Sequence, residues 1–142
     1  MKLRAMVMVG VMAITVLASA RVATAQSRMV VNVPFAFAVG NTNLPAGEYS
    51  VKASEASRTL LLINRSNPEA SVVITADAAE ALDIQTRSKL VFHHYGDRYF
   101  LSQVWLEGSS RGKQLSRTDR EKETAVAAEI EAFEQVVIAA NR

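Results

Sequence analysis

Residues 89–105, with the sequence KLVFHHYGDRYFLSQVW, constrain the fold more than any other part of the chain. Two runs rich in β-branched and aromatic residues stand on either side of Gly96-Asp97. A two-residue loop that starts with glycine is typical of a type II′ β-hairpin, because glycine accepts the positive φ that keeps the strand twist continuous. The segment therefore predicts an antiparallel hairpin in which Tyr95 pairs with Arg98.

In that register the hairpin has two unlike faces, because successive side chains of a strand point to opposite sides. The smaller face carries Val91, His93, Tyr95, Arg98, Phe100, Ser102 and Val104, and the bulkier face carries Leu90, Phe92, His94, Tyr99, Leu101, Gln103 and Trp105. We expect the bulkier face to look into the core. Five of its members could line an apolar pocket, although plain core packing is the commoner role of such a cluster. These five are Phe92, His94, Tyr99, Leu101 and Trp105.

Short β patterns also occur before the hairpin. Met29–Phe37 alternates between apolar and other residues, and Pro34 within it predicts an edge strand or a bulge, because proline cannot donate to a sheet ladder. Residues 48–53, 59–64 and 71–76 are three further strand patterns, separated by turn residues. Such closely spaced strands predict a mainly β fold. We expect a mainly antiparallel curled sheet or small β-barrel of six or seven strands, with a two-sheet β-sandwich as the alternative.

The C-terminal part of the chain is expected to form one α-helix over about residues 118–140. Thr118 and Glu121 have the spacing of a capping box, in which hydroxyl and carboxylate satisfy amides at the helix start. Four apolar residues then recur at intervals of four, three and four, which places them in one helical stripe. They are Val126, Ile130, Phe133 and Val137. We expect this stripe to dock on the sheet, with a protein partner as the alternative occupant.

Residues 1–25 have the layout of a cleavable signal peptide. Two basic residues precede a charge-free apolar run over residues 5–18, and the segment ends in Ala-Thr-Ala at residues 23–25. The run has 14 residues, which is short of the about 20 that a membrane-spanning helix needs. We therefore expect cleavage after Ala25 and export to the periplasm or the medium, with no membrane span afterwards; an uncleaved anchor is the alternative. Residues 26–142 would then form a single β-rich domain.

Removal of this leader changes the charge of the protein. The chain has 16 Lys and Arg residues against 14 Asp and Glu residues, and the leader contains Lys2, Arg4 and Arg21 without any acidic residue. The remaining chain carries 13 basic and 14 acidic residues, a net charge of −1. Nucleic acid is therefore not an expected partner, because its binding depends on neutralising phosphates with basic residues. The chain has no cysteine, so a lipid anchor on cysteine is not expected either.

Three short motifs could carry chemistry, but each has a simpler structural role. His93-His94 suggests a metal site, yet neighbours on a strand point to opposite faces. Asp97-Arg98 suits a tight turn and its solvated flank. Residues 108–112, GSSRG, lack the Gly-Lys-Ser/Thr ending of a phosphate-binding loop. We therefore predict no catalytic residue, no metal ligand and no cofactor site.

Three segments together resemble a family of small exported proteins of unknown function from soil bacteria. They are VNVPFAFAVGNTNLPAGEYSV at residues 31–51, KLVFHHYGDRYFLSQVW at residues 89–105, and QLSRTDREKE at residues 114–123. The resemblance covers most of the chain after the leader. It implies export and a single domain, and it assigns no functional residues.

These observations favour an exported, non-enzymatic module that binds a small apolar ligand or a protein partner. A strand-rich scaffold with an aromatic cluster supports ligand binding. The first alternative is a structural or assembly protein of the cell envelope that acts through its surface and helix. The second is an envelope hydrolase, which would need ionisable groups that converge on one cleft.

Overall fold

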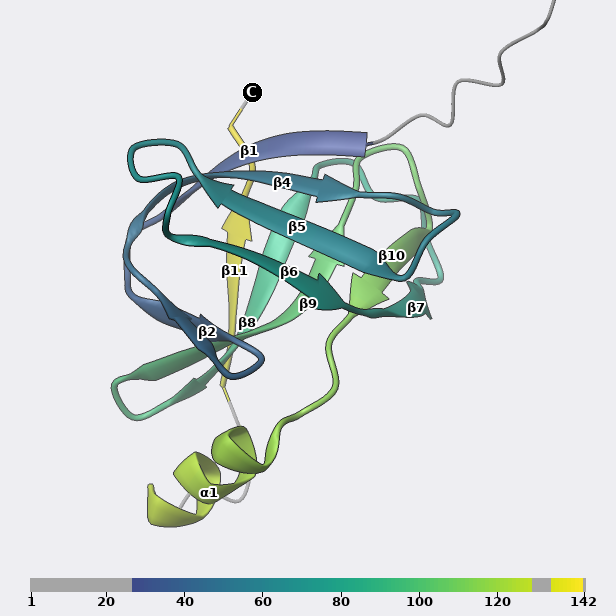
Figure 1. The fold of residues 1–142 in the computed structure, drawn as a ribbon. Coiled ribbons are helices and arrows are strands. Elements are labelled where there is room, and N and C mark those ends of the chain that lie inside the picture. Colours follow the sequence, from purple (N-terminus) through teal and green to yellow (C-terminus); the bar gives the residue numbers. More distant parts are fainter. Residues whose placement is uncertain (1–26, 129–133, 142) are drawn as a thin grey trace, which may run out of the picture.

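The computed structural model describes residues 27–128 and 134–141, which form eleven strands and one helix (Figure 1). The predicted signal peptide lies outside the described residues. The elements are β1 (Ser27–Val33), β2 (Phe37–Val39), β3 (Thr42–Leu44), β4 (Gly47–Ala53), β5 (Thr59–Asn64), β6 (Ser71–Thr75), β7 (Asp77–Glu80), β8 (Lys89–Tyr95), β9 (Arg98–Trp105), β10 (Arg111–Gln114), α1 (Asp119–Ala127) and β11 (Glu134–Ala139).

The strands form two sheets. One has four strands in the order β1-β4-β5-β6, all antiparallel. The other has seven strands: β11-β8-β9-β10-β7 form its main path, β2 joins β9 through one parallel pair, and β3 pairs with β2. The mainly β prediction is confirmed. β1 lies at an edge of its sheet as expected, but residues 29–37 are not one strand, because β1 ends at Val33 and Phe37 begins β2 in the other sheet.

The expected single curled sheet or barrel is wrong for the described part of the chain, and the strand pairing fits the two-sheet alternative instead. The chain passes from one sheet to the other at Ala76, a buried residue that connects the end of β6 to the start of β7. Of the two strands, β6 pairs with β5 and β7 pairs with β10. The four-stranded sheet therefore keeps β1 and β6 as edges and does not close.

One hydrophobic core is shared by the two sheets. Alternate residues of the four-stranded sheet, among them Val31, Val51 and Leu60, are fully buried in the same cluster as Leu90 and Phe92 of the other sheet. Aromatic rings also pack in this core. The Phe92 ring meets Phe35 and Phe37 edge to face, at 5.0 and 5.3 Å respectively between ring centroids. Strand periodicity thus places the apolar residues where both sheets bury them.

The β8–β9 hairpin has the predicted register next to its turn. Tyr95 pairs with Arg98, and the pairing continues to Phe92 with Leu101. Gly96 has φ of 59°, the positive value that the turn prediction required. Beyond this point Val91 pairs with Gln103 rather than Ser102, so β9 contains one extra residue. Such a bulge reverses the faces of the residues that follow it.

Because of this bulge, the residues of β9 that follow it lie on the opposite faces from those predicted. Leu101 and Val104 both join the shared core, although the uniform alternation placed Val104 on the other face. Trp105 is turned away from this core and covers Gly112 of β10, which lies directly opposite it. A Cβ atom on Gly112 would lie 2.6 Å from Trp105 Cε3, so only glycine permits this close approach.

The predicted helix over residues 118–140 is wrong in its second half. The helix α1 ends at Ala127, and Glu134–Ala139 forms the strand β11 on the edge of β8. The stripe is not formed, since Val126 is 78% exposed on α1 and Val137 is 53% exposed on β11. Its other members, Ile130 and Phe133, lie outside the described residues. The physical reason is the β-branched run at residues 136–138, which favours a strand where β8 offers an unpaired backbone.

Candidate functional site

A buried polar cluster joins α1 to the β8–β9 hairpin. His93 and Tyr95 are two residues apart on β8 and so share a face, and Glu121 of α1 meets both. Glu121 Oε1 lies 2.6 Å from His93 Nδ1, and the Tyr95 hydroxyl donates to the same oxygen at 3.0 Å. Arg117 Nε lies 3.7 Å from that oxygen. Each of His93, Tyr95 and Glu121 is less than 10% exposed, so these three residues fasten the helix to the sheet and are shielded from solvent, while Arg117 lies at the surface.

The predicted capping box explains how Glu121 reaches this place. The Thr118 hydroxyl accepts a hydrogen bond from the Glu121 amide at 3.2 Å, which confirms Thr118 as the N-cap. The Glu121 carboxylate does not return to the helix start but binds His93 and Tyr95. A small apolar cluster of Ala38, Tyr95, Phe100 and Ala125 lies beside these contacts. Apolar and polar contacts together fix α1 against β2, β8 and β9.

Burial and the neighbouring Glu121 carboxylate raise the pKa of Tyr95 to about 12. Burial is the larger cause, because it disfavours the charged phenolate, and the carboxylate adds to it by repelling a second negative charge. Arg117 acts in the opposite direction and lowers the pKa. Tyr95 is therefore a neutral donor to Glu121 over the physiological pH range.

This raised pKa predicts that the folded protein loses stability at high pH. A folded-state pKa above the unfolded value near 10 contributes stability that is complete below pH 10 and is lost as the pH rises through about 12. The variant Tyr95→Phe lacks this titration. We expect the free energy of unfolding, measured by urea denaturation from pH 9 to 12, to fall more steeply for the wild type than for Tyr95→Phe. Parallel curves for the two proteins would contradict the prediction.

His94 points to the other face of β8 and has different partners. Its ring stacks on Tyr99 at 4.2 Å, and Tyr99 in turn stacks on Phe35 at 3.7 Å between centroids. His94 Nδ1 lies 3.3 Å from Glu134 Oε2 on the neighbouring strand β11. Among the residues that the structure describes, no group of three or more His, Asp or Glu side chains is arranged to hold a metal ion.

Of the five residues proposed from the sequence as pocket or core, Phe92, Leu101 and Trp105 are buried, and His94 and Tyr99 are half-buried. Phe92 and Leu101 are buried in the shared core, and Tyr99 is half-buried against it. The half-buried His94 stacks on Tyr99 and is not a member of the shared core. Trp105 follows the bulge and lies on the opposite face of the sheet from Phe92 and Leu101. Its indole N–H donates to Gln103 Oε1 at 3.0 Å.

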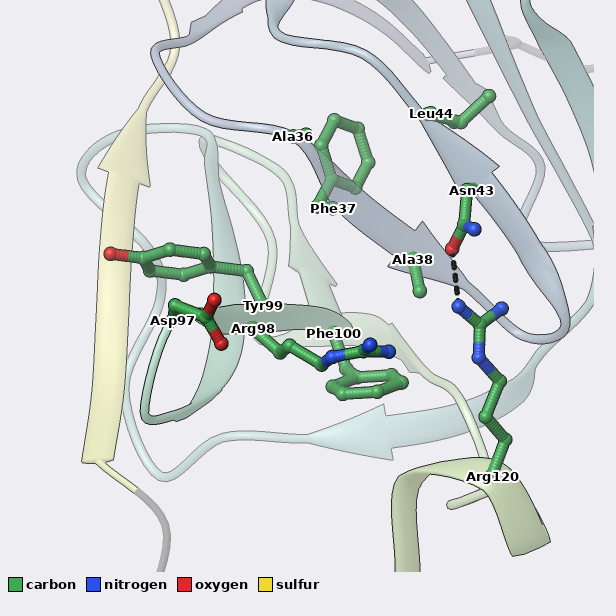
Figure 2. A pocket seen from close by; sticks show the side chains of 10 residues that line it. All are labelled: Ala36, Phe37, Ala38, Asn43, Leu44, Asp97, Arg98, Tyr99, Phe100 and Arg120. Carbon is green, nitrogen blue, oxygen red and sulfur yellow. Dashed lines mark hydrogen bonds between the residues drawn. The ribbon is translucent and has the colours of Figure 1, made fainter. Parts of the chain in front are cut away.

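An open hollow lies where the β2–β3 hairpin, the start of β9 and α1 meet (Figure 2). Its volume is about 330 Å³. Its floor is mostly apolar, and its charged groups are one carboxylate and two guanidinium groups. The lining residues are Ala36, Phe37, Ala38, Asn43, Leu44, Asp97, Arg98, Tyr99, Phe100 and Arg120. An apolar recess with few charged groups is the usual form of a small-molecule site.

The two arginines of this hollow are held differently. Arg120 of α1 donates to Asn43 Oδ1 at 2.7 Å and to the Asn41 carbonyl at 3.4 Å, so its position is fixed by the β2–β3 hairpin. Arg98 is exposed, and within residues 27–128 and 134–141 its side chain forms no hydrogen bond or ion pair. In Figure 2 the Arg98 side chain extends toward Arg120, whereas the Asp97 carboxylate lies on the side of Tyr99.

A larger hollow near the C-terminal strand is less suited to a ligand. It has a volume of about 460 Å³ and is lined by Arg28, Arg65 and Arg87 among others. These arginines are already engaged: Arg28 donates to Ser50, Arg65 pairs with Glu48 at 2.6 Å, and Arg87 donates to the Ala140 carbonyl. Their contacts hold strands and the chain end together, which is a structural role.

Comparisons with protein-family models, with curated proteins and with solved structures give no match. No helix in the described part of the chain is long and apolar enough to cross a membrane. The geometry of the hollow and of the buried cluster is therefore the basis for a functional assignment.

Proposed function

We propose that the protein is an exported, non-enzymatic binding module that holds a small, partly apolar ligand in the hollow between the β2–β3 hairpin, β9 and α1. The observation that carries the proposal is the hollow itself, which combines an apolar floor with two guanidinium groups at its rim. Export rests on the signal-peptide pattern of residues 1–25 and on the family resemblance. Strands β2, β3 and β9 of the seven-stranded sheet supply rigid walls of the site, and α1 supplies Arg120.

A surface site is favoured over a ligand inside the fold. Side chains of both sheets occupy the interior, and ten described residues there are less than 2% exposed, including Tyr49, Phe92 and Leu60. An apolar ligand between the sheets would have to displace this packing, whose density is close to that of a crystal. The hollow, in contrast, is open to solvent without any rearrangement.

The buried cluster supports a non-enzymatic role. The His93–Glu121 pair resembles the base and orienting acid of a hydrolase, but a general base must come within hydrogen-bond reach of its substrate. Both side chains are enclosed, and the hydroxyl hydrogen-bonded to this pair belongs to Tyr95, whose raised pKa keeps it a neutral donor. The contacts of the cluster explain the position of α1 without assigning it a reaction.

The proposal is tested by asking whether the hollow binds small aromatic molecules. We expect naphthoate or its neutral amide, added to isotope-labelled protein, to give saturable NMR shifts at the amides of Ala38 and Phe100. Ala36 is exposed at the rim, so Ala36→Trp should fill the hollow and weaken binding about tenfold or more, since its indole takes the contact area of the ligand.

The matched control is Ala56→Trp, which places the same ring on an exposed alanine in the β4–β5 turn, outside the hollow. This variant should bind like the wild type. Absence of saturable shifts with both probes, or equal weakening by both variants, would reject the hollow as the binding site.

A further inference from the structure

Arg98 and Arg120 together line two adjacent recesses. The first is the hollow described above, and the second, of about 320 Å³, has Arg98, Arg120, Glu123, Thr124 and Ala127 as its lining. The two guanidinium groups therefore stand on the shared wall between the recesses. Arg98 lies on β9 and Arg120 on α1, and the two residues are 22 positions apart in the sequence. Positive charges gathered in a recess with apolar walls raise the local potential and concentrate anions there.

Neither arginine of this wall has an ion-pair partner among the described residues, although two carboxylates line the same recesses. Asp97 lines the hollow and Glu123 lines the adjoining recess, but neither forms an ion pair with Arg98 or Arg120 among the described residues. In Figure 2, the Asp97 carboxylate lies beside Tyr99, at the far end of the hollow from Arg120. Arg58 and Arg65, elsewhere on the surface, differ from Arg98 and Arg120 because each of them has a carboxylate partner.

From this arrangement we propose that the ligand is an amphipathic oxyanion: a small molecule whose apolar body rests on the floor of the hollow and whose carboxylate or phosphate group binds between Arg98 and Arg120. The inference rests on the proposed binding function and adds the chemical class of the ligand. Planar guanidinium groups match the oxygens of carboxylates and phosphates with paired N–H donors. Asn43 holds Arg120 in place before the ligand arrives, which reduces the ordering cost of binding.

The two arginines differ in how much the fold depends on them, so one of them is better suited to a variant that tests the inference. The Arg98 side chain forms no hydrogen bond or ion pair among the described residues, whereas Arg120 also connects α1 to the β2–β3 hairpin. Arg98→Gln should therefore change the free energy of unfolding little and act mainly on the affinity for anions. Arg111→Gln removes the same charge from the exposed end of β10, outside both recesses, and is the matched control.

The experiment compares naphthoate, naphthyl phosphate and uncharged naphthamide by NMR titration of the full protein and both variants. We expect both anions to bind the wild type about tenfold more tightly than the amide, because hydrogen bonds to charged groups are the stronger kind. Arg98→Gln should remove most of that preference, because it lowers the affinity for the two anions much more than the affinity for the amide. Arg111→Gln should retain the preference. The anion that binds more tightly tells a carboxylate ligand from a phosphate ligand.

Three outcomes would overturn the inference. Equal affinities of the wild type for the anions and for naphthamide would remove the anion requirement while leaving the proposed binding function in place. Equal loss of anion affinity in Arg98→Gln and Arg111→Gln would show that overall charge, not the arginine pair, attracts the anions. Binding of none of the three probes would overturn the inference together with the proposed function.

Discussion

Replacing Phe92 with alanine is expected to destabilise the protein by about 3–5 kcal/mol, the usual cost of removing a phenyl ring from a packed core. Phe92 is fully buried at the point where the two sheets meet. Its ring makes edge-to-face contacts with Phe35 and Phe37, so the variant loses both ring contacts and leaves a cavity between the sheets. Urea denaturation of the wild type and the variant measures the difference.

Leu82→Ala is the control for this experiment. Leu82 is as apolar as a core residue, but it lies fully exposed in the connection between β7 and β8, so its truncation should change the free energy of unfolding by about 0.5 kcal/mol or less. Phe92→Leu keeps much of the buried volume and should fall between the two. Equal destabilisation by Phe92→Ala and Leu82→Ala would contradict the packing of Phe92 between the sheets.

The parts of the fold that the sequence predicted correctly are those set by local chemistry. The Gly96-Asp97 dipeptide fixed the turn and the pairing of Tyr95 with Arg98, because turn type determines the register of the nearest residues. Strand patterns at residues 48–53 and 59–64 agree with β4 and β5 to within one residue at each end. The Thr118 cap was also found from local spacing.

The errors arose where distant parts of the chain decide the outcome. The extra residue at Ser102 lies inside a regular alternation, and its presence depends on the strands that flank β9. The segment at residues 134–139 contains apolar residues that suit a helix stripe as well as a strand, and the edge of β8, 40 residues earlier in the chain, selects the strand. Short apolar runs do not distinguish these structures by periodicity alone.

The candidate site could not be assembled from the sequence for the same reason. Its floor depends on one parallel pair between Ala38 and Phe100, and its rim on the hydrogen bond between Asn43 and Arg120, which are 77 residues apart. For the buried cluster behind it, the local signal was the two-residue spacing of His93 and Tyr95 on a strand, which predicts a shared face but not the Glu121 carboxylate that meets both side chains. Glu121 was interpreted only as a capping residue.

The second large effect is expected for Glu121→Ala, which should destabilise the protein by about 3 kcal/mol, because each buried donor that loses its acceptor costs about 1–3 kcal/mol. Two such donors are involved, since His93 and Tyr95 both meet Glu121 Oε1. Truncation also separates α1 from β8, so the amides of α1 should lose protection in hydrogen exchange before the sheets unfold. Urea denaturation and amide exchange together measure both effects.

Glu123→Ala provides the matched control, because Glu123 belongs to the same helix but is exposed. Both variants remove one negative charge and add one good helix former, so their difference isolates the buried contacts. Glu121→Gln should be less damaging than Glu121→Ala, since its amide oxygen still accepts from Tyr95. If Glu121→Ala and Glu123→Ala had the same stability and the same exchange protection in α1, the buried cluster would not be what fastens the helix. The wall of the hollow that carries Arg120 would then need another support.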